Sequence, residues 1–255
     1  MKIASWNVNS LRARQQHALD WLKANPVDAI GLQELKLQDE QFPYAEFEAL
    51  GYKAAVNGQK TYNGVAILSR HPLEDVVRDL PDQHDQKRVI AATVQGVRIV
   101  NVYVPNGQAV GSEKYDYKLR WLASLRDSLR GELAQHPQLA VTGDFNVAPT
   151  DADVHDPVAW EGQVLCSPPE RSAFGELLKL GLQDAFGLFP RPEQAYTWWD
   201  YRQGAFRRNL GLRIDHILVS PGLVTKCLSF QIDKEVRKLE RPSDHAPVYI
   251  TLTPI

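Results

Sequence analysis

The order of the expected elements predicts an α/β protein built from packed β-sheets flanked by helices. Segments rich in β-branched residues outnumber segments with helical periodicity, and many of them follow one another directly. A simple alternation of strand and helix would not give this order. The chain has 255 residues, 44% of them hydrophobic, and α/β units of this length often form one domain. We therefore expect a single domain over residues 1–255.

Eight segments are expected to form strands because they are rich in β-branched residues and bounded by turn residues. They are Lys2–Val8, Ala29–Gln33, Gly64–Ser69, Val89–Val94, Val97–Val104, Leu139–Thr142, Asp215–Val219 and Pro247–Leu252. The pair Gln95-Gly96 joins two of these segments and predicts a β-hairpin. Helical periodicity predicts four helices. They are Gln15–Ala24, Tyr44–Leu50, Tyr115–Ala134 and Arg171–Leu180.

The composition is that of an ordinary globular protein. A net charge of −2 and a pI near 6.4 argue against a generally basic nucleic-acid coat protein. DNA binding stays open, because only the contact face must be positive. Cys166 and Cys227 form no metal or redox pattern, and reduced thiols are expected, with a single bridge as the alternative. The segment Pro149–Pro169 is either a linker or a long surface loop beside a site.

Location and assembly can be predicted only in outline. The N-terminus reads MKIASWNVNS and lacks a secretory apolar stretch, and no apolar run approaches the length of a membrane span. We expect a cytoplasmic protein with no membrane partner. Nothing in the sequence calls for more than a monomer.

Polar residues suited to metal binding adjoin several of the predicted strands. They are Asn7, Asn9, Glu34, Asp144, Asn146, Asp215, Asp244 and His245. Members of a pair two residues apart, such as Asp144 and Asn146, would share one face of an extended backbone. Mg²⁺ prefers oxygen ligands and open positions for water and phosphate, whereas Zn²⁺ would favour more His or Cys. The pattern therefore indicates a magnesium site.

Each of these residues also has an ordinary structural explanation. Asp and Asn at strand ends commonly form turns or cap helices, and a lone histidine such as His245 is commonly structural. Five such segments in one chain, each adjoining a buried-looking strand, favour a functional centre.

Nine motifs occur in order from Ile3 to Val248. They are WNVNSLRAR, LQELK, GVAILSR, NVYVPNG, GDFNVAPTDAD, PPER, TWWDYR, GLRIDHILVS and PSDHAPV. The ordered set resembles the exonuclease III-type apurinic/apyrimidinic endonucleases of the endonuclease/exonuclease/phosphatase superfamily. SDH and GDFN are shared across the superfamily, whereas WDYR followed by GLRID is typical of its DNA-repair branch. The resemblance implies a four-layer α/β sandwich of two packed mixed β-sheets flanked by helices, the DNase I-like fold.

The resemblance also implies a metal set. Glu34 would be the principal carboxylate for Mg²⁺, with Mn²⁺ as a substitute. Asn7 would lie beside it, and Asp244 would be an outer carboxylate. A dication suits the chemistry because a phosphodiester is anionic and repels hydroxide. One ion is preferred, and a second could use Asp244 or Asp215.

Five further residues receive catalytic roles from the resemblance. Asp144 would orient or deprotonate the attacking water, and Asn146 would hold phosphate or water. Asp215 and His245 would form a carboxylate–imidazole pair that contacts a phosphate oxygen. Tyr103 would approach the scissile phosphate, although a tyrosine packed in the core at a strand end explains YVPNG equally simply. Fixed amide, phenol and imidazolium donors are suited to a charge-rich transition state.

Aromatic and arginine residues interleave in AYTWWDYRQGAF and beyond it, as suits a flipped or frayed nucleotide. Trp198 resembles the aromatic wall of the family's abasic-sugar pocket, whereas strand alternation predicts that Trp199 faces the core. Each basic candidate is, by itself, most often a solvated surface charge. The predicted DNA contacts are Arg12, Lys36, Trp198, Arg202, Arg207 and Arg208.

The expected substrate is double-stranded DNA with abasic sites, nicks or blocked 3′ ends. Leu212 stands where some relatives carry Trp, and the stretch Gln163–Pro169 before PPER departs from the family pattern. Both departures lie near the sugar pocket, so 3′→5′ exonuclease or 3′-end-cleaning activity could dominate over incision at abasic sites. The alternatives are a phosphatase or lipid phosphodiesterase of the same superfamily, and a non-catalytic DNA-binding module.

Overall fold

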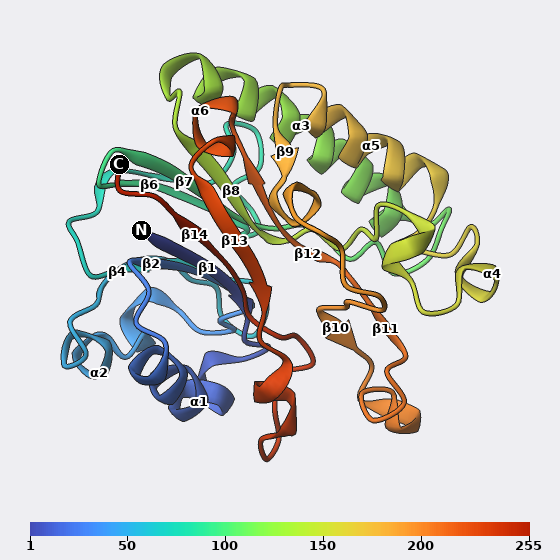
Figure 1. The fold of residues 1–255 in the computed structure, drawn as a ribbon, viewed down its shortest axis with the longest axis horizontal. Coiled ribbons are helices and arrows are strands. Elements are labelled where there is room, and N and C mark those ends of the chain that lie inside the picture. The colour runs from blue at the N-terminus through green and yellow to red at the C-terminus, as the bar shows by residue number, and fades with distance from the viewer.

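Two six-stranded mixed β-sheets pack face to face, and helices cover both outer faces (Figure 1). The computed structural model describes residues 1–255. The first sheet has the strand order β13-β14-β1-β2-β4-β3, and the second has the order β5-β6-β7-β8-β12-β9. Within mainly antiparallel sheets, β1 and β2 run parallel, as do β7 and β8. This is the four-layer α/β sandwich that the family resemblance implied, and it agrees with the packed sheets and helices expected from the residue pattern.

The strands of the first sheet are β1 (Lys2–Asn7), β2 (Ala29–Gln33), β3 (Lys53–Asn57), β4 (Val65–Ser69), β13 (Cys227–Ile232) and β14 (Val248–Leu252). Those of the second are β5 (Glu74–Arg78), β6 (Val89–Val94), β7 (Val97–Tyr103), β8 (Leu139–Asp144), β9 (Gln183–Asp184) and β12 (Asp215–Val219). A separate ribbon pairs β10 (Trp198–Trp199) with β11 (Gly211–Leu212).

Helices α1 (Leu11–Ala24) and α2 (Tyr44–Glu48) lie on the first sheet, and α3 (Glu113–Gln135) and α5 (Pro168–Leu178) on the second (Figure 1). Short helices and 3₁₀ turns occupy the connections. They are α4 (Pro157–Trp160), α6 (Pro221–Val224), η1 (Asp39–Gln41), η2 (Asp151–Asp153), η3 (Ala185–Leu188), η4 (Arg202–Gly204) and η5 (Lys234–Lys238). None of the helices combines the length and apolar character needed to cross a membrane.

The differences from the predicted elements have local causes. The edge strands β5 and β13 were missed because most of their residues are exposed or half-buried, which removes the apolar alternation. Helix α5 begins three residues before Arg171, because Ser167 and Glu170 form a capping box with a proline at the first helical position. The hairpin prediction is confirmed: Gln95 and Gly96 have φ of 49° and 79° in the two-residue turn between β6 and β7.

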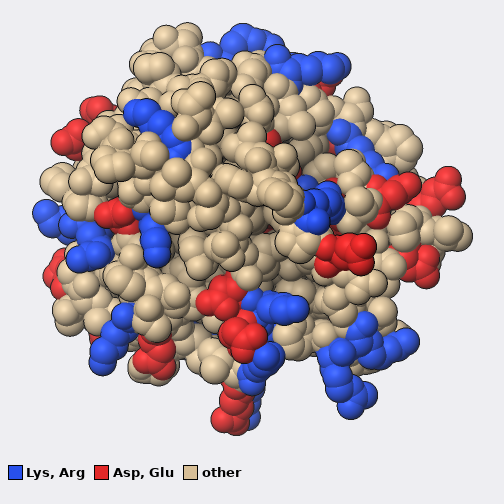
Figure 2. All heavy atoms as spheres, in the orientation of Figure 1, with Lys and Arg blue, Asp and Glu red and all other residues tan.

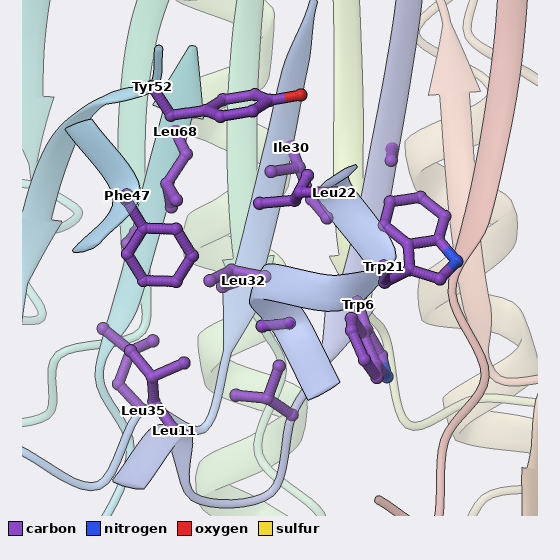
Figure 3. Packing of buried hydrophobic residues seen from close by; sticks show 14 of the residues in the cluster. Trp6, Leu11, Trp21, Leu22, Ile30, Leu32, Leu35, Phe47, Tyr52 and Leu68 are labelled. Atoms are coloured by element: carbon purple, nitrogen blue, oxygen red, sulfur yellow. The ribbon is translucent and has the colours of Figure 1, made fainter. Parts of the chain in front are cut away.

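Alternation along the strands divides the apolar residues among three layers. On β1, Trp6 points outward and packs with Leu22 and Leu32 beneath α1, as Figure 3 shows. Ile3 points the other way, into the apolar layer between the two sheets. A third cluster, which includes Val141, lies beneath α3 and α5. The residues of β1 that face the second sheet are therefore the odd-numbered ones.

Towards the ends of β1, β2, β7 and β8, the layer between the sheets becomes polar. Asn101 of β7 donates to the carbonyl oxygens of Leu32 and Ala66 across the interface, at 2.9 and 3.0 Å. Its Oδ1 accepts from Gln33 Nε2 at 2.7 Å and from Thr142 Oγ1 at 3.2 Å. Buried polar groups that are paired in this way favour one arrangement of their neighbours. The hydrogen bonds of Asn101 therefore favour one relative position of the two sheets.

The network leaves no space beside Gly31 of β2. A Cβ added there would lie 2.4 Å from Asn101 Oδ1 and 2.8 Å from Thr142 Oγ1. We therefore expect Gly31→Ala to lower the free energy of unfolding by about 1–3 kcal/mol, as overpacked cores do. Urea unfolding measures the change. Gly131→Ala is the matched control, because Gly131 lies in α3 with nothing within 4 Å of an added Cβ. It should be neutral or stabilising by up to about 1 kcal/mol. A Gly31→Ala protein as stable as the unmodified one would contradict this account of the interface.

Candidate active site

The candidate site lies where the polar layer between the sheets reaches the strand ends. Asn7 shares the inward face of β1 with Ile3 and Ser5, and Asp144 shares the inward face of β8 with Thr142. The two sheets thus bring Asn7 Nδ2 within 2.9 Å of Asp144 Oδ2. Strand register adds two more groups, because Asp144 is the pairing partner of Tyr103 on β7 and of Asp215 on β12.

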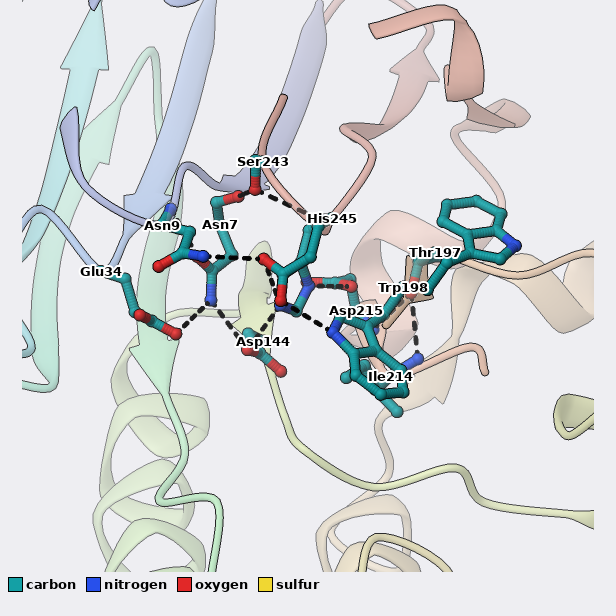
Figure 4. A network of polar contacts seen from close by, with 12 residues as sticks. Asn7, Asn9, Glu34, Asp144, Thr197, Trp198, Ile214, Asp215, Ser243 and His245 are labelled. Carbon is teal, nitrogen blue, oxygen red and sulfur yellow. Dashed lines mark hydrogen bonds and ion pairs between the residues drawn. The ribbon is translucent and has the colours of Figure 1, made fainter. Parts of the chain in front are cut away.

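Glu34 follows β2 directly and points into the same space (Figure 4). Its Oε1 accepts from Tyr103 Oη at 2.7 Å and from Asn7 Nδ2 at 3.1 Å. Lys36 Nζ lies 3.4 Å from its Oε2. Asn7 therefore links Glu34 and Asp144 through its amide nitrogen, while its Oδ1 accepts from the backbone N–H of Asn9.

The backbone is strained around the centre. Glu34, Asn9 and Asn146 have φ of 52°, 44° and 49°, in the left-handed region that costs energy for residues other than glycine. Strain of this kind persists only where the surrounding contacts impose it, and it gathers at functional sites.

His245 and Asp215 form a buried pair at the other side of the centre. His245 Nδ1 lies 2.9 Å from Asp215 Oδ2, and Nε2 lies 3.6 Å from Asp144 Oδ2. Burial by itself lowers the pKa of His245, but Asp215, Asp144 and Asp244 together raise that pKa to about 10. The imidazole is therefore a cation at neutral pH, and its Nε2 faces the carboxylates of Asp144 and Asp244.

Asp144 is the most perturbed carboxylate. The pKa of Asp144 is raised to about 7, chiefly by burial and then by Asp215 and Glu34, while His245 and the hydrogen bond from Asn7 oppose the rise. Burial also holds the pKa of Tyr103 well above its usual value, with Glu34 and Asp144 adding to the effect. Tyr103 is thus a neutral hydrogen-bond donor.

The ligand atoms of Asp144, Asp215 and His245 lie within 4.8 Å of one another, close enough to share a metal ion. Because Asp215 holds His245 as a cation, a metal bound here would lie nearer to Glu34 and Asp144 than to the imidazole.

The SDH turn connects the centre to the β10–β11 ribbon. Asp244 Oδ2 accepts from Trp198 Nε1 at 3.0 Å, and Oδ1 accepts from Asn9 Nδ2 at 3.2 Å.

Asn146 is held beside Asp144: its backbone N–H donates to Asp144 Oδ1 at 3.0 Å, and its Nδ2 donates to the Val104 carbonyl. All eight residues predicted for metal binding and catalysis therefore converge.

The predicted DNA contacts divide into two groups. Lys36 and Trp198 touch the centre through Glu34 and Asp244. Arg202, Arg207 and Arg208 are exposed on the loop after β10, at the lower right of Figure 1, where basic residues gather in Figure 2. Arg202 is paired with Asp200 at 2.7 Å. Arg12 is exposed at the start of α1. Trp199 is buried, as strand alternation predicted.

Sequence reasoning missed groups that hold the centre in place. Ser243 Oγ donates to the Asn7 carbonyl at 2.6 Å and accepts from the backbone N–H of His245 at 3.2 Å. Lys118 of α3 is fully buried, and its Nζ donates to the carbonyls of Asn106 and Asn146. The SDH motif was a usable signal for Ser243. Lys118 gave none, because a lysine in a helix is normally exposed.

The sandwich and the acid–base centre at its strand ends define the DNase I-like class of enzyme. The chain belongs to the endonuclease/exonuclease/phosphatase family, whose sequence profile matches residues 4–245. It is 36% identical to exodeoxyribonuclease III of Haemophilus influenzae, and the alignment covers 98% of each chain.

Two solved structures are similar over 100% of both chains. One is the 3′ phosphatase NExo from Neisseria bound to a product DNA hairpin, with a TM-score of 0.97 and 48% identity. The other is an AP endonuclease from Archaeoglobus fulgidus, with a TM-score of 0.96 and 38% identity. The exonuclease III-type resemblance predicted from the motifs is thereby confirmed.

The His245–Asp215 pair makes a prediction about titration. Asp215→Asn removes the nearest negative charge, so the pKa of His245 should fall from about 10 to near or below its ordinary value of 6.5. In the unmodified protein the pair stabilises the fold fully below about pH 6.5, and this contribution is lost as pH rises through about 10. NMR titration of the imidazole measures the shift, with His245→Gln as the control that assigns the resonance. An imidazole still protonated above about pH 8 in Asp215→Asn would contradict the pairing.

Proposed function

We propose that this protein is a Mg²⁺-dependent DNA-repair phosphodiesterase that acts mainly at 3′ ends. The observation that carries the proposal is the convergence of Glu34, Asp144, Asp215 and His245 from the ends of both sheets. A cluster of carboxylates beside one imidazolium suits the hydrolysis of an anionic ester better than an acyl transfer, which would need an activated Ser or Cys.

The residues fit a divalent cation. Burial, with smaller contributions from Asp215 and Glu34, raises the pKa of Asp144, and a dication beside these carboxylates would stabilise their charged forms. Glu34 would hold it with Asn7 beside it, and Asp244, whose oxygens accept from Trp198 and Asn9, would be an outer carboxylate. When bound, Mg²⁺ or Mn²⁺ supplies charge neutralisation and a water of lowered pKa.

The side chains of the protein supply the remaining chemistry. Asp144 orients the attacking water and accepts its proton, because it is the buried carboxylate that lies between Asn7 and His245 in the centre. His245 donates from Nε2 to a phosphate oxygen, and Asp215 maintains its charge. Tyr103 adds a neutral donor, and the amide of Asn146 is fixed for the same purpose.

An apolar cluster beside Trp198 supports a preference for 3′ ends. Leu165 and Cys166, from the stretch that departs from the family pattern, are buried there with Leu212 and Ile214. Side chains packed against Trp198 leave less room for a sugar flipped out of a continuous strand, whereas a 3′-terminal group can approach the centre by fraying. The 48% identical Neisseria relative is described as a 3′ phosphatase, which agrees with this preference.

A substrate panel tests the proposal. With Mg²⁺, the protein as a monomer should remove 3′-phosphate and 3′-phosphoglycolate groups and degrade recessed 3′ ends faster than it incises internal abasic sites. Intact duplex should be cut least, and chelation should abolish every activity. Hydrolysis of an inositol phosphate with none of DNA would establish the phosphatase or lipid phosphodiesterase alternative instead.

Asp144→Asn is the companion variant. We expect it to reduce hydrolysis at least about 100-fold with DNA binding retained, because it removes the proton acceptor and keeps the shape. Arg130→Gln, which changes an exposed cation of α3, serves as the control for general effects of substitution. An unchanged rate in Asp144→Asn would remove this residue from the mechanism.

A further inference from the structure

Four strands form the outer edges of the two sheets, and β13 is the least protected of them. Proteins usually shorten, charge or cover such edges, because an edge strand presents unpaired backbone groups. β9 has only two residues, and β5 carries Glu74, Asp75 and Arg78. On β3, the carbonyl of Val56 accepts from Arg78 Nε at 2.9 Å. By contrast, β13 has no charged residue among its six, and its Leu228 is 57% exposed.

The backbone of β13 offers hydrogen-bonding groups on its free side. After a bulge at the start of the strand, Ser229–Ile232 pair with β14 in regular register. The N–H of Asp233 donates to the carbonyl of Pro247, which is the next pair of this register. Because hydrogen-bonded pairs alternate along an antiparallel ladder, Phe230 and Ile232 turn their N–H and C=O groups away from β14. No other part of the protein hydrogen-bonds to these groups.

A cavity of about 440 Å³ lies beside this free edge, within the size range of pockets that bind ligands. All five residues of Leu228–Ile232 line it, and most of its other lining residues belong to the segment between η3 and β10. That segment cannot pair with β13 as a regular strand, because its Pro190 and Pro192 have no N–H to donate. The ring of Phe186 also lines the cavity and packs edge-on against Phe230, with centroids 5.4 Å apart.

The lining determines which occupant fits. Of its 16 residues only Glu193 and Lys234 are charged, and these two exposed groups are opposite in sign. An extended peptide complements every feature of the groove. Its backbone pairs with the free groups of β13, an apolar side chain packs in the cavity, and one acidic and one basic residue lie near Lys234 and Glu193. A second copy of this chain fits less well, because each copy would also bring the proline-containing segment that flanks its own edge.

We propose that the free edge of β13 binds an extended segment of a partner protein as an added strand. The segment carries an aromatic or branched apolar side chain for the cavity, with an acidic residue on one side and a basic residue on the other. None of the lining residues belongs to the catalytic centre, so binding there leaves the catalytic side chains free. The groove is therefore a place where another protein attaches to the enzyme.

Selection from a phage-displayed library of random linear peptides, each of about 12 residues, tests the proposal. The unmodified protein should select peptides of this pattern, and fluorescence anisotropy measures the affinity of synthetic copies. Leu228→Asp should weaken binding at least about tenfold, because it places a charge on the apolar edge. Val158→Asp is the matched control, since Val158 is an 84% exposed valine of α4 outside the groove, and it should leave the affinity unchanged.

The charge of the groove is tested by a reversal. Lys234→Glu should weaken binding of a selected peptide about threefold or more, in line with an exposed ion pair. Replacing the acidic residue of that peptide by lysine should restore the affinity for Lys234→Glu and weaken it for the unmodified protein.

Backbone pairing is tested with N-methylated copies of the same peptide. Methylation of the amide nitrogens that face β13 should weaken binding at least about tenfold, whereas methylation of the alternate ones should not. In the complex, the amide hydrogens of Phe230 and Ile232 should exchange at least about tenfold more slowly with solvent. The proposal is overturned if no peptide is selected, if Leu228→Asp binds as tightly as the unmodified protein, or if neither methylation pattern matters. A dimer in sedimentation experiments that Leu228→Asp dissociates would assign the edge to a second copy and would also overturn it.

Discussion

The site depends on the close approach of carboxylates that the two sheets impose at their junction. Glu34 comes from the first sheet, and Asp144 and Asp215 come from adjacent strands of the second. Burial and these neighbours raise the pKa of Asp144 to about 7, and His245 and Lys36 lie within 4 Å of Asp144 and Glu34 as opposing charges. The folded protein therefore keeps a local excess of negative charge, which a bound divalent cation would neutralise.

The rest of the fold holds these groups together. The Asn101 network fixes the approach of the two sheets, the Ser243 hydroxyl ties the turn before His245 to Asn7, and Lys118 supports the loops that carry Asn106 and Asn146. Each support is a buried polar contact between segments far apart in sequence. Such contacts add little net stability, but they favour one arrangement over its competitors. We conclude that polar side chains replace apolar ones in the layer between the sheets near the site, and that their hydrogen bonds define the positions of the catalytic residues.

Much of this could be predicted from the sequence. The inward strands are apolar and long enough to recognise, and Asp144, Asp215 and Glu34 stand at their ends. The edge strand β13 and the supporting role of Lys118 could not be predicted, for different physical reasons. An edge strand that is largely exposed has no apolar period, and the buried environment of Lys118 exists only after α3 has packed against Glu170 of α5. The order of the motifs predicted the family, whereas hydrophobic periodicity alone predicts only packed sheets flanked by helices.

The most direct test of the central claim is an anomalous diffraction measurement on crystals soaked in Mn²⁺. The carboxylate arrangement predicts a strong anomalous peak within coordination distance, about 2.0–2.4 Å, of a Glu34 carboxylate oxygen. The same peak should be lost in Glu34→Gln crystals that keep the fold. Manganese bound only elsewhere on the surface, with none between Glu34 and Asp144, would contradict the claim that this junction of the sheets is a metal-dependent catalytic centre.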